Sequence, residues 1–110
     1  MIEKLLQQKQ AMHNLEENFE KKFKRGLTQF LIMDHLKKIN SSKASTIASY
    51  IGLNRSAVTG HLDRMELNDL IKRTPIKCDR RVKAITLTKY AKSWYQRNKD
   101  KCYEFLNNWV

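Results

Sequence analysis

The sequence has 110 residues, 41% of them hydrophobic, which allows one domain with a modest core. Its apolar runs are far shorter than the ~20 residues of a membrane-spanning helix, its N-terminus lacks the pattern of a secretory signal, and its two distant cysteines cannot form a disulfide framework. We therefore expect a cytoplasmic protein, and the net charge of +11 indicates a polyanionic partner unless the surface is merely solvated.

Residues 2–24 have the periodicity of an amphipathic helix, because apolar side chains recur three or four positions apart. Gly26 is expected to stop this helix. Thr28 is expected to be the N-cap of a second helix that ends near Ile39, and residues 40–43 form a connector. The apolar positions of the first helix are Ile2, Leu5, Leu6, Met12, Leu15, Phe19 and Phe23.

Two short helical segments separated by a glycine come next. Ser45 is expected to cap residues 46–51, and Gly52 to supply the turn. Asn54 is expected to cap a helix of residues 55–68. An apolar stripe at positions i, i+4 and i+7 predicts the buried side of that helix, namely Val58, Leu62 and Met65. Two helices joined in this way are typical of a helix-turn-helix.

After residue 69 the period changes to that of β-strands. Residues 70–74 and 82–87 are predicted strands, and the polar residues 75–81 between them have the length of a hairpin loop. The stretch 71–92 holds eight basic residues and one acidic residue, a charge of +7 out of +11. A basic hairpin directly after a helix-turn-helix indicates a wing. Composition alone does not separate DNA from RNA or an acidic membrane as its partner.

Thr88 is expected to cap a C-terminal helix that runs to about Asn108 and carries a broad aromatic face with both tryptophans. A winged lobe can cover only part of such a face. We therefore expect this helix and the N-terminal one to form a homodimer interface. Packing of the two helices on each other within one chain is the alternative.

These elements predict a mainly α fold, an α+β winged helix, as a single domain over residues 1–110. The lobe of residues 27–87 would bind DNA, and residues 2–24 and 88–110 would be dimerisation helices.

The pattern resembles the MarR family over residues 27–91. Seven fragments occur in the order and spacing of that family: Leu27–Met33, Ile47–Ala48, Ser56–Thr59, Asp63–Glu66, Leu70–Arg73, Asp79–Arg81 and Leu87–Thr88. The resemblance implies a homodimer whose second motif helix enters the major groove, with the wing in or beside the minor groove. Members are usually repressors that small molecules, metals or oxidants release from DNA.

Four features depart from the family pattern. The glycine that ends the second motif helix is Asp69, and either Asp69 or the neighbouring Asn68 can still take a left-handed conformation at some cost. The glycine of Leu-Thr-x-x-Gly is Ala91. Gly60 stands where many members have a basic or larger residue, which costs about 1 kcal/mol of helix propensity. Members usually run some 30 residues further, so the dimer is expected to depend on residues 2–24 and 88–110 alone.

The helix of residues 55–68 should face DNA with the side opposite its apolar stripe. The contacts expected there are Asn54, Arg55, Ser56, Thr59, Gly60, His61 and Arg64. Arg55 can pair with guanine, and the Ser56 and Thr59 hydroxyls can bond to base edges unless they serve only as first-turn caps. Asp63 is expected to orient Arg64 or Arg55.

The expected wing contacts are Lys77, Asp79, Arg80, Arg81 and Lys83. An arginine at a hairpin tip can enter a narrow, electronegative minor groove. By resemblance Asp79 holds Arg81 in position, which leaves Arg80 as a phosphate contact. A solvated hairpin is the alternative. Ser42, Lys43 and Ser45 are the expected phosphate contacts near the start of the first motif helix.

Metal, cofactor and enzyme sites are not indicated. The histidines and cysteines show no ligand spacing, and Thr28, Asp34 and His35 are interpreted as cap and surface groups. Cys102 is expected in the core. Cys78, close to Lys77 and Arg80 in an exposed loop, is a candidate redox sensor.

The sequence thus predicts a homodimeric, sequence-specific double-stranded DNA-binding protein that acts on a palindromic operator as a transcriptional regulator of the repressor type. A non-sequence-specific architectural or plasmid-associated DNA-binding protein is the first alternative. A protein-interaction module whose wing meets an acidic partner is the second. The operator and any effector are not indicated by the sequence.

Overall fold

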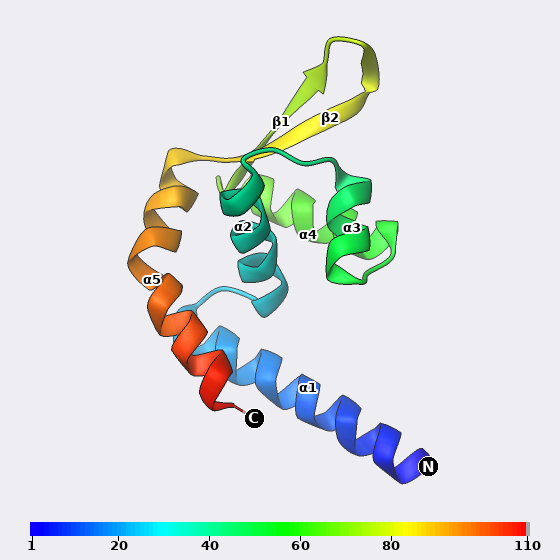
Figure 1. Ribbon diagram of the computed structural model, residues 1–110, viewed down its shortest axis with the longest axis vertical. Coiled ribbons are helices and arrows are strands. Elements are labelled where there is room, and N and C mark those ends of the chain that lie inside the picture. The colour runs from blue at the N-terminus through cyan, green and yellow to red at the C-terminus, as the bar shows by residue number, and fades with distance from the viewer. Residues whose placement is uncertain (110) are drawn as a thin grey trace. The chain divides into compact units, whose positions relative to one another are not determined.

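The computed structural model describes residues 1–109 and confirms the expected mainly helical winged-helix fold (Figure 1). The elements are α1 (Ile2–Phe23), α2 (Leu27–Ile39), α3 (Ala44–Ile51), α4 (Arg55–Leu67), β1 (Ile71–Ile76), β2 (Asp79–Leu87) and α5 (Lys89–Asn108). The chain forms two compact units, one of residues 28–98 and one of residues 1–27 with the segment from Lys99 onward. None of the helices described in residues 1–109 combines the length and hydropathy needed to cross a bilayer.

The larger unit has a core built from the apolar sides of its helices and the base of its hairpin. Side chains with at most 2% exposure come from α2, α3, α4, the residue before β1, the hairpin and the start of α5: Phe30, Ile32, Met33, Leu36, Ile47, Val58, Leu62, Met65, Leu70, Ile71, Ile85 and Ala91. The hairpin of β1 and β2 extends away from α2, α3 and α4 (Figure 1). The part of the hairpin that reaches beyond the helices is therefore free to meet a partner.

The N-cap residues expected from the sequence are found at α4 and α5 but not at α2 and α3. Asn54 Oδ1 accepts the N–H of Ala57 at 2.8 Å, which confirms this N-cap. Thr88 Oγ1 accepts the N–H of Ala91 at 3.0 Å, which confirms the cap of α5. Thr28 and Ser45, by contrast, already lie in the first turns of α2 and α3, so they are not N-caps.

The ends of α3 and α4 need left-handed backbone. Gly52 follows α3 with φ 83° and donates its N–H to the carbonyl of Ala48 at 2.9 Å. Asp69 has φ 59° at the end of α4, where the family pattern has glycine, so of the two candidate residues Asp69, not Asn68, takes the left-handed conformation. The two turns set the direction in which α4 and then β1 leave the motif.

The hairpin is longer than the sequence indicated. The residues expected as a loop, 75–81, are mostly strand: Pro75 and Ile76 belong to β1, and β2 begins at Asp79. The turn is reduced to Lys77 and Cys78, and the register shifts between Pro75 and Ile76. Proline and polar residues are tolerated here because the described sheet has two strands and residues 74–81 near its tip are exposed or half-buried.

Two polar residues of α2 are buried, which corrects their interpretation as surface groups. The hydroxyl of Tyr95 donates to Asp34 Oδ1 at 2.6 Å, and Lys38 Nζ lies 3.0 Å from Asp34 Oδ2. The ring of His35 stacks on Tyr50, with centroids 4.5 Å apart. Burial lowers the pKa of His35, against the raising effect of neighbouring Asp34. Both side chains belong to the interior of the larger unit.

The smaller unit is centred on an aromatic cluster. Phe105 lies 5.8 Å from Phe19 and 5.7 Å from Phe23, measured between ring centroids, and stacks on Trp109 at 5.6 Å. Cys102 is fully buried, as expected of a core residue. The contact of Phe105 with Phe19 and Phe23 packs the C-terminal helix against the N-terminal helix within one chain. From the sequence, this packing was the alternative to a homodimer interface.

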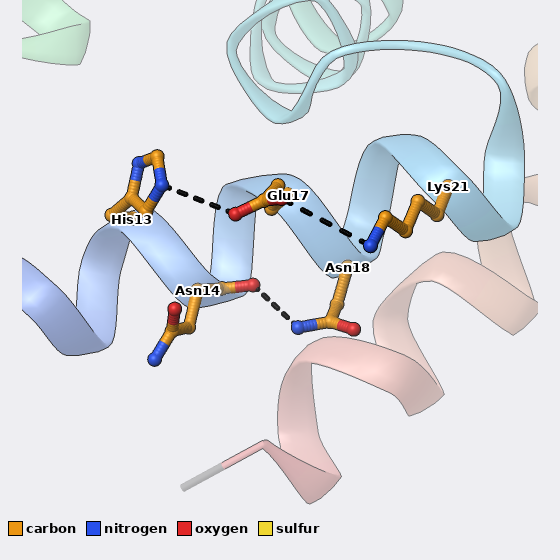
Figure 2. Close-up of polar contacts among 5 residues, drawn as sticks. All are labelled: His13, Asn14, Glu17, Asn18 and Lys21. Carbon is orange, nitrogen blue, oxygen red and sulfur yellow. Dashed lines mark hydrogen bonds and ion pairs between the residues drawn. The ribbon is translucent and has the colours of Figure 1, made fainter.

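The remainder of α1 is not covered by the chain. Its N-terminal apolar residues are 51–81% exposed: Ile2, Leu5, Leu6 and Met12. The C-terminal half also carries a row of polar contacts, shown in Figure 2. His13 Nε2 lies 3.1 Å from Glu17, Lys21 Nζ lies 3.9 Å from Glu17, and Asn18 donates to the carbonyl of Asn14 at 2.7 Å. These pairs at spacing i, i+4 support the helix weakly because they are exposed.

Candidate nucleic-acid interface

The outward side of α4 carries the residues that the sequence singled out. Val58, Leu62 and Met65 are at most 1% exposed, which confirms the buried stripe. On the other side Arg55, Ser56, Thr59 and Arg64 are exposed, as is Asn54 at the N-cap, while Gly60 and His61 are half-buried. Since Asn54 provides the cap, the Ser56 and Thr59 hydroxyls are not needed for that purpose. They are available to a ligand.

The wing holds one of its arginines in a defined position. Asp79 Oδ1 accepts the backbone N–H of Arg81 at 3.0 Å and its Nε–H at 3.2 Å. This confirms the expected pairing of the two residues. The Arg81 side chain remains 90% exposed, so the pairing orients the guanidinium without hiding it. The other wing cations, Lys77, Arg80 and Lys83, are also exposed.

The start of α3, the outer side of α4 and the wing meet around one hollow of about 560 Å³. Among its lining residues are five cations from these elements: Lys43, Arg55, Arg73, Arg81 and Lys83. Ser45 and Thr59 add hydroxyl groups, and Asp63 is the acidic residue in the lining. Residues that are 40 positions apart in the sequence therefore share one concave cationic surface. Such a surface concentrates positive potential and attracts polyanions.

Arg73 is a residue of this surface that the sequence did not single out. From β1 its guanidinium reaches two carboxylates of α4, Asp63 Oδ1 at 2.9 Å and Glu66 Oε1 at 2.8 Å. The expectation that Asp63 would orient Arg64 or Arg55 is therefore wrong. The Arg73 side chain is only 18% exposed, which makes this fork the main polar link between wing and helix. The sequence feature that could have indicated this pairing is the i, i+3 spacing of Asp63 and Glu66, which puts both acids on one side of the helix.

Comparison with known proteins identifies the family of this chain. The model of the MarR family matches residues 27–83, from α2 into β2. The chain belongs to the MarR family. The HTH-type transcriptional repressor MdtR of Bacillus subtilis (strain 168) is 42% identical over 74 residues, which cover 66% of this chain and 48% of MdtR. This chain thus spans about half the length of that relative.

Solved structures of similar fold include a MepR like protein crystallised with pseudoligands. It is 29% identical, with a TM-score of 0.73, and the alignment covers 86% of this chain and 68% of that one. Reduced AbfR bound to DNA is 21% identical, with a TM-score of 0.75 and coverage of 97% and 77%. The likeness to AbfR shows the shared fold alone.

In this MarR-family chain Ser42 lies inside the lobe. It exchanges both backbone hydrogen bonds with Ile85, at 3.1 and 2.8 Å, and its Oγ lies 3.3 Å from Nε2 of His35. The side chain is 8% exposed and cannot reach a phosphate without leaving these partners. Ser42 therefore joins the start of α3 to β2, and the expected contact role is retained only for Lys43 and Ser45, which are exposed.

The two cysteines differ in access. Cys78 is exposed at the wing turn, whereas Cys102 is buried and burial raises its pKa to about 11. We expect iodoacetamide at pH 8 to label Cys78 and to spare Cys102 until the protein is unfolded, because the thiolate is the reactive form. Mass spectrometry before and after denaturation measures this. Native Cys78→Ser should take up no label, and rapid native labelling of Cys102 would contradict its place in the core.

Within residues 1–109 no cluster of three or more potential metal ligands is formed.

Proposed function

We propose that this chain binds double-stranded DNA in a sequence-specific manner as a homodimer and acts as a transcriptional repressor. The observation that carries the proposal is the shared hollow, where the outer side of α4, the start of α3 and the wing present five cations together. The similar proteins agree with this proposal, since MdtR is a transcriptional repressor and AbfR was solved bound to DNA.

The geometry supports a particular placement on the duplex. The outer side of α4 would lie in the major groove, where Arg55 meets guanine and Thr59 meets a hydrogen-bonding edge or a thymine methyl group. Arg81, held by Asp79, would enter the minor groove. Lys43 and Ser45, at the N-terminus of α3, would contact phosphates.

The uncovered part of α1 supports the homodimer. Four large apolar side chains there are at least 51% exposed. Covering them in a second copy removes apolar surface from water, which is favourable in proportion to its area. A two-fold dimer requires a palindromic operator with half-sites about one helical turn, roughly 34 Å, apart.

The proposal is tested by selecting bound duplexes from a random pool and then footprinting the winners. We expect a palindromic consensus, protected with two-fold character, and a 2:1 complex of protein to duplex in sedimentation. An enriched pool without a consensus would contradict sequence specificity. The concentrated charge of the wing would then favour the architectural DNA-binding protein, whose affinity and salt dependence are equal for all duplexes.

Replacing Arg81 by alanine should weaken binding to the selected duplex about tenfold, because a minor-groove contact and its positive charge are lost together. The matched control is Lys9→Ala, which removes a charge of the same sign from α1. That variant should stay within about twofold of the parent protein. Fluorescence anisotropy at several salt concentrations measures both. Equal effects of the two substitutions would contradict the placement of the wing on DNA.

A further inference from the structure

Gly60 leaves a gap on the outer side of α4 that another side chain occupies. A Cβ built on Gly60 would lie 3.7 Å from Nη1 of Arg64, so the guanidinium of Arg64 extends over the glycine. Helical side chains lean toward the N-terminus and cover the preceding turn, which explains how a residue four positions later reaches this point. The charge of Arg64 is thereby carried over the preceding turn, toward the N-terminal half of the helix.

His61 holds the guanidinium there. Nη2 of Arg64 lies 3.1 Å from Nδ1 of His61. Arginine has only donors, so Nδ1 must be the acceptor, which fixes the neutral tautomer that carries its proton on Nε2. Arg64 thus has one of its hydrogen-bonding groups occupied by His61 and keeps further N–H donors for a ligand.

The acidic residues of α4 do not compete for Arg64. Asp63 and Glu66 are both paired with Arg73 from β1, at 2.9 and 2.8 Å. Arg64 is exposed and forms no ion pair within the part of the chain that the structure describes. A planar guanidinium that is positioned, exposed and not neutralised is suited to bidentate recognition.

We propose that Arg64, seated over Gly60 and positioned by His61, is a specificity-determining residue that reads a guanine in the major groove. The partner group is the O6/N7 edge of the base, which accepts two parallel hydrogen bonds from arginine. A Cβ at position 60 would only touch the guanidinium, at 3.7 Å, whereas a side chain that extends beyond Cβ would compete with Arg64 for this space. This inference rests on the proposed function, since it assigns one base position within the DNA site.

The test is selection of duplexes with four proteins: the parent chain, Arg64→Ala, His61→Ala and His61→Asn. The parent chain should prefer guanine at one position of each half-site. Arg64→Ala should lose that preference, with an affinity loss of about tenfold for the parent's own site. His61→Ala should lose the same preference although it removes no arginine, whereas His61→Asn retains an acceptor near the place of Nδ1 and should keep it.

Lys43→Ala is the matched control for loss of charge. It should weaken binding to selected and random duplexes alike and leave the consensus unchanged. Thermal melting followed by circular dichroism checks that the variants are folded. If Arg64→Ala selects the parent's consensus at every position, the assignment of Arg64 is overturned and the proposed function stands. If the parent chain selects no consensus, sequence-specific binding itself is overturned, and the assignment of Arg64 with it.

Discussion

Replacing Leu62 by alanine should lower the free energy of unfolding by about 2–5 kcal/mol. Leu62 is 1% exposed in the middle of the buried side of α4, so truncation removes buried methyl groups and leaves a cavity that the neighbours fill only in part. Urea unfolding followed by circular dichroism measures the change.

The control for this substitution lies in the same helix. Leu67→Ala removes the same atoms from a residue that is 86% exposed, and should change the free energy of unfolding by no more than about 0.5 kcal/mol. Similar losses for the two variants would mean that α4 is not seated as described. The outward positions of Arg55, Thr59 and Arg64 would then be unsupported, and so would the proposal that this side of α4 binds DNA.

Replacing Arg73 by alanine should reduce affinity for the selected duplex about tenfold or more. The substitution removes one cation of the shared hollow and leaves Asp63 and Glu66 unneutralised on α4, the helix proposed to enter the major groove. It also frees the wing from its main polar link to α4. The free energy of unfolding should fall by only about 1 kcal/mol, since both carboxylates are roughly half exposed.

Two variants separate these effects of Arg73. Arg73→Lys keeps the charge but not the planar fork, so it should recover part of the affinity. Lys72→Ala removes the neighbouring exposed charge and should cost only a few-fold in affinity, with a shallower salt dependence. If Arg73→Ala and Lys72→Ala weaken binding equally, Arg73 contributes charge alone and does not position the wing.

Contacts within the protein position the cations of the proposed interface. Asp79 orients Arg81, Arg73 neutralises the acids of α4, and His61 holds Arg64 over Gly60. A polar neighbour thus orients Arg81 and Arg64, and the pairing of Arg73 with the acids of α4 keeps those acids from neutralising Arg64. These contacts are present in the protein without DNA. Such preorganisation reduces the conformational entropy that binding must otherwise remove.

The amino-acid sequence by itself determined the orientation of α4 and two of its boundaries. The helical period places Val58 and Leu62 on one side, so the opposite residues must face outward whatever the rest of the fold does. The Asn54 cap and the left-handed Asp69 also followed from the sequence. These features depend on residues at most a few positions apart, and local geometry is sufficient to specify them.

Only the tertiary structure decided the features that join distant segments. The fork of Arg73 joins β1 to α4, and the burial of Asp34 depends on Tyr95, which lies 61 positions away. Ser42 is internal because β2 takes both of its backbone hydrogen bonds, and the wing strands lengthen because each supplies the other's hydrogen-bonding partners. A polar residue near a helix start has the same local sequence pattern whether it faces water or the interior. The partner that decides between the two is brought to it by the fold, and its position cannot be inferred from spacing along the chain.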